Sequence, residues 1–165
     1  MLTQPEPWMR GPIEGVEPLV APVFYSFTQV REELAHYTEG LTTEQVWRQV
    51  NSLPTLGFHL RHIAGSVDRL MSYLMEAEIS PEQIAQLKSE GQPGASLAEL
   101  LAGIDAAFAK AESQLRTIKA EDIHAPRYIG RKRLPTSVLG LLVHVSEHTQ
   151  RHLGQSITTA KLMRS

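Results

Sequence analysis

Three histidines recur at four-residue intervals near the C-terminus, in a stretch whose apolar pattern indicates a buried helix: His144, His148 and His152. Residues four apart on a helix are surface neighbours, with Cβ atoms about 5–6 Å apart. Two imidazoles at that spacing can bind one metal ion, because Zn–N bonds are only about 2.0–2.1 Å long. A third ligand must then come from another part of the chain. This spacing is the strongest functional signal in the sequence.

The position of these histidines on the helix limits what they can do. A helical wheel places His148 and His152 near the buried face and His144 at its edge. Two neighbouring imidazoles are costly to bury unless they form hydrogen bonds or bind a metal. Hydrogen-bonded core histidines, or histidines at a partner interface, explain the pattern as well as a metal site does. The last helix alone leaves these interpretations open.

A second histidine pair, His59 and His62, lies in the apolar segment that follows Thr55. On the helical wheel, His59 borders the apolar stripe and His62 lies further from it. Periodicity therefore favours His59 as the third ligand and predicts a solvated position for His62.

A basic cluster directly precedes the histidine helix and consists of Arg127, Arg131, Lys132 and Arg133. Such a cluster could bind the carboxylates or phosphate of an anionic substrate near a metal. A short run of charge is equally typical of a solvated loop. The cluster is therefore a candidate contact for an anionic substrate, and a solvated loop is the alternative.

The composition limits the class of protein. The chain has 165 residues, of which 42% are hydrophobic and 21% charged, as expected for one globular domain. It has no cysteine, so a metal would depend on His, Asp or Glu. A net charge of −2 does not favour nucleic acid or an anionic membrane as a partner. Without a signal peptide or a long apolar run, we expect a cytoplasmic protein with no transmembrane helix.

Apolar residues at intervals of three and four predict four long helices, at about residues 19–39, 56–76, 97–118 and 136–162. Prolines make residues 1–18 an extended lead-in. Capping-box residues, Ser80 with Gln83 and Ser96 with Glu99, open a short helix and the third long one. Residues 119–136 look irregular, with a small hairpin near Tyr128.

Four amphipathic helices with little strand signal predict an all-α fold: a four-helix bundle that forms a single domain over residues 1–165. The connection between the second and third long helices is about 20 residues long, more than an antiparallel hairpin needs. We therefore expect a long crossover connection there.

Motifs of other chemistries are absent from the sequence. It has no phosphate-binding Gly-rich loop, no nucleophile elbow and no His-Glu-x-x-His. In His-Glu-x-x-His the glutamate directly follows the first histidine. Here Glu147 directly precedes the second histidine, His148, so the sequence does not predict a metalloprotease site.

Two segments resemble the DinB-like family of small metal-binding four-helix proteins, to which the bacillithiol and mycothiol S-transferases are related. Residues 55–64, Thr-Leu-Gly-Phe-His-Leu-Arg-His-Ile-Ala, are similar to the second-helix pattern of that family. Residues 147–155, Glu-His-Thr-Gln-Arg-His-Leu-Gly-Gln, are similar to its last-helix signature. The order and spacing of the helices agree, so the resemblance extends over nearly the whole chain.

The resemblance implies that His62, His148 and His152 are the metal ligands. His59 falls where the family usually has an aliphatic residue, which makes it a neighbour and reverses the preference from periodicity. His59 and His144 stay lesser candidates. The resemblance also implies a divalent metal (zinc, nickel or manganese) and often a homodimer.

The resemblance does not imply a single reaction. Our leading hypothesis is a transferase that passes a low-molecular-weight thiol to an electrophile, with a small molecule as substrate and neither nucleic acid nor membrane as partner. A metal-dependent hydrolase is the nearest alternative. A dimeric bundle that only binds metal, and histidines that are purely structural, are the non-enzymatic ones.

Overall fold

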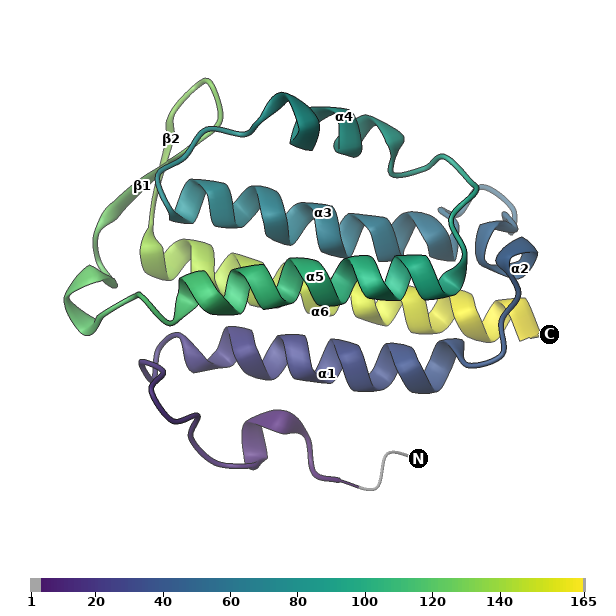
Figure 1. Cartoon of the computed structure of the whole chain (residues 1–165), viewed down its shortest axis with the longest axis horizontal. Coiled ribbons are helices and arrows are strands. Elements are labelled where there is room, and N and C mark those ends of the chain that lie inside the picture. Colours follow the sequence, from purple (N-terminus) through teal and green to yellow (C-terminus); the bar gives the residue numbers. More distant parts are fainter. Residues whose placement is uncertain (1–3, 165) are drawn as a thin grey trace.

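Four long helices lie side by side in the computed structural model, which describes residues 4–164 (Figure 1). They are α1 (Ala21–Thr38), α3 (Leu56–Leu74), α5 (Leu97–Leu115) and α6 (Val138–Arg164). Two short helices, α2 (Thr43–Trp47) and α4 (Pro81–Ser89), lie in the connections. The predicted all-α four-helix bundle is confirmed. No helix within residues 4–164 is long and apolar enough to cross a membrane.

The directions of the helices explain the crossover connection. Followed along the chain in Figure 1, α1 and α6 run one way, and α3 and α5 run the other. The neighbours α3 and α5 are therefore parallel, and the chain must return along the bundle between them. The 19 residues of α3 span about 28 Å. The connection that carries α4 covers this distance, which is why it is long.

Helix starts follow the predicted capping residues. Ser80 and Gln83 bond reciprocally at the start of α4, and Ser96 and Glu99 do the same at α5. At the start of α3, the Thr55 hydroxyl accepts a hydrogen bond from the backbone N–H of Phe58. These bonds satisfy N–H groups that have no partner inside the helix. The start of α3 determines where along the bundle its histidines lie.

The segment before α6 forms the predicted small hairpin, with β1 (Pro126–Ile129) antiparallel to β2 (Leu134–Ser137). Further towards the N-terminus, two short 3-10 turns occur, at Pro7–Met9 and Ala120–Asp122. The first of these lies within the predicted extended lead-in, which is therefore only partly extended. Residues 1–3 of that lead-in lie outside the described range.

Apolar side chains from all four long helices form one core. Phe27 of α1 and Phe108 of α5 stack with ring centroids 4.0 Å apart. From α6, the side chains of Val138, Leu141, Leu142 and Val145 are buried in this core. The core holds α6 against α1 and α3, and this packing sets the position of its histidines.

Gly57 of α3 is required by close packing. A Cβ at Gly57 would lie 2.7 Å from ring atoms of Trp47, whose Nε1 donates a hydrogen bond to the Ala95 carbonyl at 2.7 Å. Because the ring is held, we expect Gly57→Ala to lower the free energy of unfolding by about 1–3 kcal/mol.

Gly103→Ala is the control, since a Cβ there meets nothing within 4 Å. It should raise stability by about 0.4–1 kcal/mol. Urea unfolding of both variants measures the difference, and equal effects would contradict this account.

Candidate metal centre

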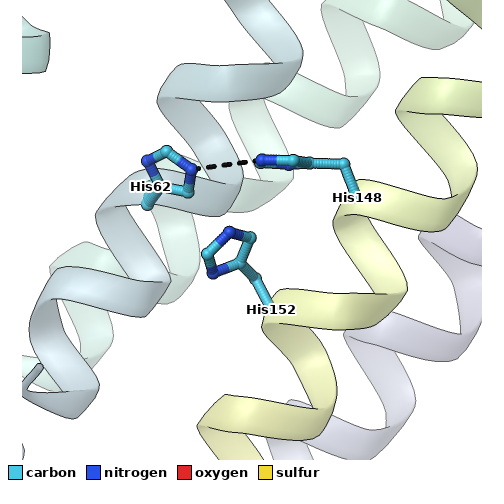
Figure 2. Close-up of side chains that lie close together, drawn as sticks. All are labelled: His62, His148 and His152. Carbon is cyan, nitrogen blue, oxygen red and sulfur yellow. Dashed lines mark hydrogen bonds between the residues drawn. The ribbon is translucent and has the colours of Figure 1, made fainter. Parts of the chain in front are cut away.

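Three histidine rings from two helices converge on one point (Figure 2). His62 comes from α3, and His148 and His152 come from α6. One nitrogen from each ring lies within 4.8 Å of the corresponding nitrogens of the other two. The Nε2 atoms of His62 and His148 are 3.4 Å apart. The ring of His152 turns one nitrogen toward this pair, as Figure 2 shows.

The cluster lies at the edge of the bundle core. All three rings are half-buried, and the His62 side chain keeps 18% of its surface exposed. The buried residues Ile63 of α3 and Leu153 of α6 follow two of these histidines directly in the sequence. The site is thus anchored on its inner side and accessible on its outer side. A metal ion here would retain coordination positions for an exogenous ligand, as in open zinc sites.

The ring of His62 is oriented by a carboxylate. Its Nδ1 lies 2.7 Å from Oε2 of Glu90, the residue that follows α4. An ionised carboxylate only accepts hydrogen bonds, so His62 donates its Nδ1–H and leaves the Nε2 lone pair free. That lone pair is on the side of the ring that faces His148. Outer hydrogen bonds of this kind are usual for metal-binding histidines.

The ring of His152 is oriented by a fourth histidine. The Nδ1 atoms of His152 and His59 are 3.2 Å apart, and His59 is 3% exposed. When Nδ1–H of His152 donates to His59, the Nε2 atom of His152 keeps its lone pair for the cluster. The burial of His59 agrees with periodicity, but the ring that joins the cluster from α3 is that of His62. His59 contacts the cluster through His152 and lies outside the group of three converging rings.

Burial keeps the rings of His148, His152 and their neighbour His59 neutral. It is the largest cause that lowers the pKa of His148 and His152 to about 4, and the nearby His62 adds to this effect. Burial, with a smaller effect of His62, also lowers the pKa of His59 to about 4. The neutral form is the one that binds metal. The three-imidazole donor set therefore fits a divalent ion such as zinc or nickel at neutral pH.

Glu90 is ionised despite its position. Burial raises the pKa of its carboxyl group, but the hydrogen bond from His62 and the charge of Arg69 outweigh that effect, so the pKa is below its ordinary value. Arg69 of α3 lies 2.9 Å from the other carboxylate oxygen. Neither residue belongs to a recognisable motif, so this pair could not be predicted from the sequence.

His144 lies at the outer rim of the cluster. Its ring centroid is 5.3 Å from that of His148, and its Nδ1 is 2.9 Å from a carboxylate oxygen of Glu147. The other carboxylate oxygen of Glu147 accepts a hydrogen bond from Arg151 at 2.6 Å. Glu147 and Arg151 therefore form an ion pair along the helix, and His144 extends it.

The basic cluster that was a candidate substrate contact lies away from the three histidines. Nε of Arg127 donates to the carbonyl of Leu74 at 2.6 Å, at the C-terminal end of α3. Leu74 lies about 18 Å along the helix from His62, at 1.5 Å per residue. In the hairpin turn that follows, Arg133 lies over the Tyr128 ring at 4.5 Å, and Arg131 and Lys132 are exposed. The structure does not bring these side chains to the three histidines.

The fold and the three converging imidazoles together define a helical-bundle protein with a candidate metal centre. The sequence model of the DinB superfamily matches residues 26–156, and the chain belongs to that superfamily. A solved structure, described as a conserved protein from Enterococcus faecalis, shows the same fold with a TM-score of 0.71 at 16% identity. That match covers 90% of this chain and 98% of the other. No curated protein matches the sequence. The family indicated by the two histidine segments is thus confirmed.

The lowered pKa values predict acid sensitivity of the metal-free protein. In the unfolded chain a histidine titrates near 6.5, whereas His59, His148 and His152 titrate at about 4 in the folded state. Between these values the unfolded state binds more protons, so stability decreases as the pH falls from about 6.5 to about 4. Urea unfolding across this range measures the slope.

Two substitutions isolate the contribution of the buried rings. His59→Leu removes one buried histidine and should reduce this slope, while His124→Gln at an exposed position should leave it unchanged. A free energy of unfolding that is constant between pH 6.5 and 4.5 would contradict the lowered pKa values of the buried histidines.

Proposed function

We propose that this chain is a divalent-metal-dependent enzyme that transfers a low-molecular-weight thiol to an electrophile. The observation that supports it is the convergence of three imidazoles at a half-buried, solvent-accessible point. His62, His148 and His152 would hold the ion. A bound divalent ion supplies one chemical property, which is a lowered pKa of a coordinated thiol or water.

The residues of the chain prepare the site for this role. Burial keeps His148 and His152 neutral at neutral pH, so protons do not compete for their lone pairs. The chain has no cysteine, so none of its own thiolates competes with an external thiol.

One cation is near enough to attract an anionic thiol. The charge of Arg151 contributes to the lowered pKa of both His148 and His152, which places it within electrostatic range of the cluster. Its guanidinium is exposed and paired with Glu147 at the rim. A thiol that carries carboxylates would therefore meet a positive charge beside the histidines.

Metal binding tests the ligand assignment. Wild-type protein loaded with zinc, nickel or manganese should hold one ion per chain, measured by elemental analysis. His148→Ala should weaken the affinity by more than about 100-fold, more than the loss of an outer contact does. His36→Ala is the matched control, since that histidine is exposed on α1. Metal retained undiminished by His148→Ala would contradict the assignment.

Activity assays test the reaction class. Metal-loaded protein should speed the consumption of a low-molecular-weight thiol by a chromogenic electrophile, and His148→Ala should abolish this rate. Cleavage of model esters or amides without thiol transfer would replace the transferase by a hydrolase. Tight metal binding with neither rate would leave a non-enzymatic metal-binding bundle.

A further inference from the structure

We propose that Glu90 is a positioning residue for His62, held in place by Arg69 in space that Gly65 leaves open on α3. The inference deepens the proposed function, since it requires that the three histidines bind a metal ion. It assigns a role in the metal site to the crossover connection between α3 and α5.

The two oxygens of the Glu90 carboxylate have different partners. Oε2 lies 2.7 Å from Nδ1 of His62, and Oε1 lies 2.9 Å from a guanidinium nitrogen of Arg69. Glu90 is 4% exposed and Arg69 is 9% exposed. A buried carboxylate needs such partners, because burial of an unpaired charge is costly. Arg69 therefore compensates the charge of the group that orients His62.

Gly65 makes this arrangement sterically possible. A Cβ at Gly65 would lie 2.7 Å from Oε1 of Glu90 and 2.8 Å from the guanidinium of Arg69. In the sequence, Gly65 lies between His62 and Arg69, three residues after the first and four before the second. Residues at these spacings share one helix face. A glycine inside a helix weakens it, and here the missing side chain lets the carboxylate lie against α3.

The backbone on both sides of Glu90 is also fixed to α3. Arg61 donates hydrogen bonds to the carbonyls of Ser89 and Gln92, which flank Glu90. The Arg61 guanidinium in turn lies over the Trp47 ring, 4.7 Å from its centroid. One face of α3 thus supplies both the metal ligand and the groups that hold the carboxylate behind it. A role only in stability would not require the contact to His62.

The consequence for metal binding is specific. A carboxylate that accepts from Nδ1–H fixes the tautomer and ring orientation and increases the basicity of Nε2. Loss of such an outer contact typically weakens metal affinity by about 10–100-fold. We expect Glu90→Ala to produce a loss of this size. Glu90→Gln should recover part of it, because the amide oxygen can still accept from His62.

The experiment compares these variants with a matched control. Glu112 of α5 also pairs with an arginine, Arg31 at 2.6 Å, and its side chain is 26% exposed. Zinc affinity is measured by competition with a chromophoric chelator, and the cobalt-loaded proteins are compared by their visible absorption. Thermal unfolding of the metal-free proteins separates stability from affinity. Glu112→Ala should leave the zinc affinity and the cobalt spectrum unchanged.

Two further variants keep the test decisive if Glu90→Ala unfolds because Arg69 is left unpaired. Glu90→Ala combined with Arg69→Met removes both charges and should recover thermal stability without recovering zinc affinity. Gly65→Ala should weaken zinc affinity with the wild-type carboxylate still present, because the new Cβ displaces it.

The outcomes separate this inference from the proposed function. Zinc affinity within twofold of wild type in the double variant, with an unchanged cobalt spectrum, would overturn the role of Glu90 and leave the metal site intact. A wild-type chain that binds no divalent ion would overturn the proposed function itself. A 10–100-fold loss with partial recovery in Glu90→Gln supports the inference.

Discussion

The packing of α3 against α6 is the constraint on which the rest of the structure depends. The buried faces of these helices, with Leu60 and Ile63 on one and Val145 and Leu153 on the other, belong to the same apolar core. Burial of apolar surface is non-directional, but the interdigitated side chains determine one rotation and one axial offset for each helix. His62 meets His148 and His152 only at that rotation and offset. The candidate metal centre is therefore a product of core packing.

Four imidazoles at the edge of a core are costly to bury, and the structure compensates for this cost locally. His59, His148 and His152 stay neutral, which avoids most of the desolvation penalty. Two of them, His62 and His152, are hydrogen-bonded on the side away from the shared point. The single carboxylate among these partners is matched by Arg69. The result is a site in which ring nitrogens of His62, His148 and His152 face one another at short range, a geometry that suits a shared cation.

The crossover connection follows from the same architecture. Parallel neighbours such as α3 and α5 require a connection as long as the bundle, and a connection of that length passes over the surface of α3. Glu90 lies where this connection turns back toward α5, and Arg61 fixes it there. A segment that the topology requires for geometric reasons thereby supplies a charged group to the histidine cluster.

The sequence by itself determined the features that depend on near neighbours. Spacings of three or four residues along one helix predict the helix positions, the capping residues Ser80 and Ser96, and the pairing of His148 with His152. Resemblance to a family, rather than periodicity, indicated His62. Periodicity measures burial, and His59 is indeed the more deeply buried ring. Which α3 nitrogen points at α6 depends on how the two helices are rotated against each other.

Two further features were decided only by the tertiary structure. Glu90 is 28 residues from His62, and nothing in its local sequence distinguishes it from other helix-end glutamates. The basic hairpin directly precedes α6 in the sequence, yet His148 follows ten residues after Val138, about 15 Å along the helix. Proximity in the sequence is therefore a poor guide to proximity in a bundle, because a helix carries each residue away from its neighbours along the axis while packing brings distant residues together.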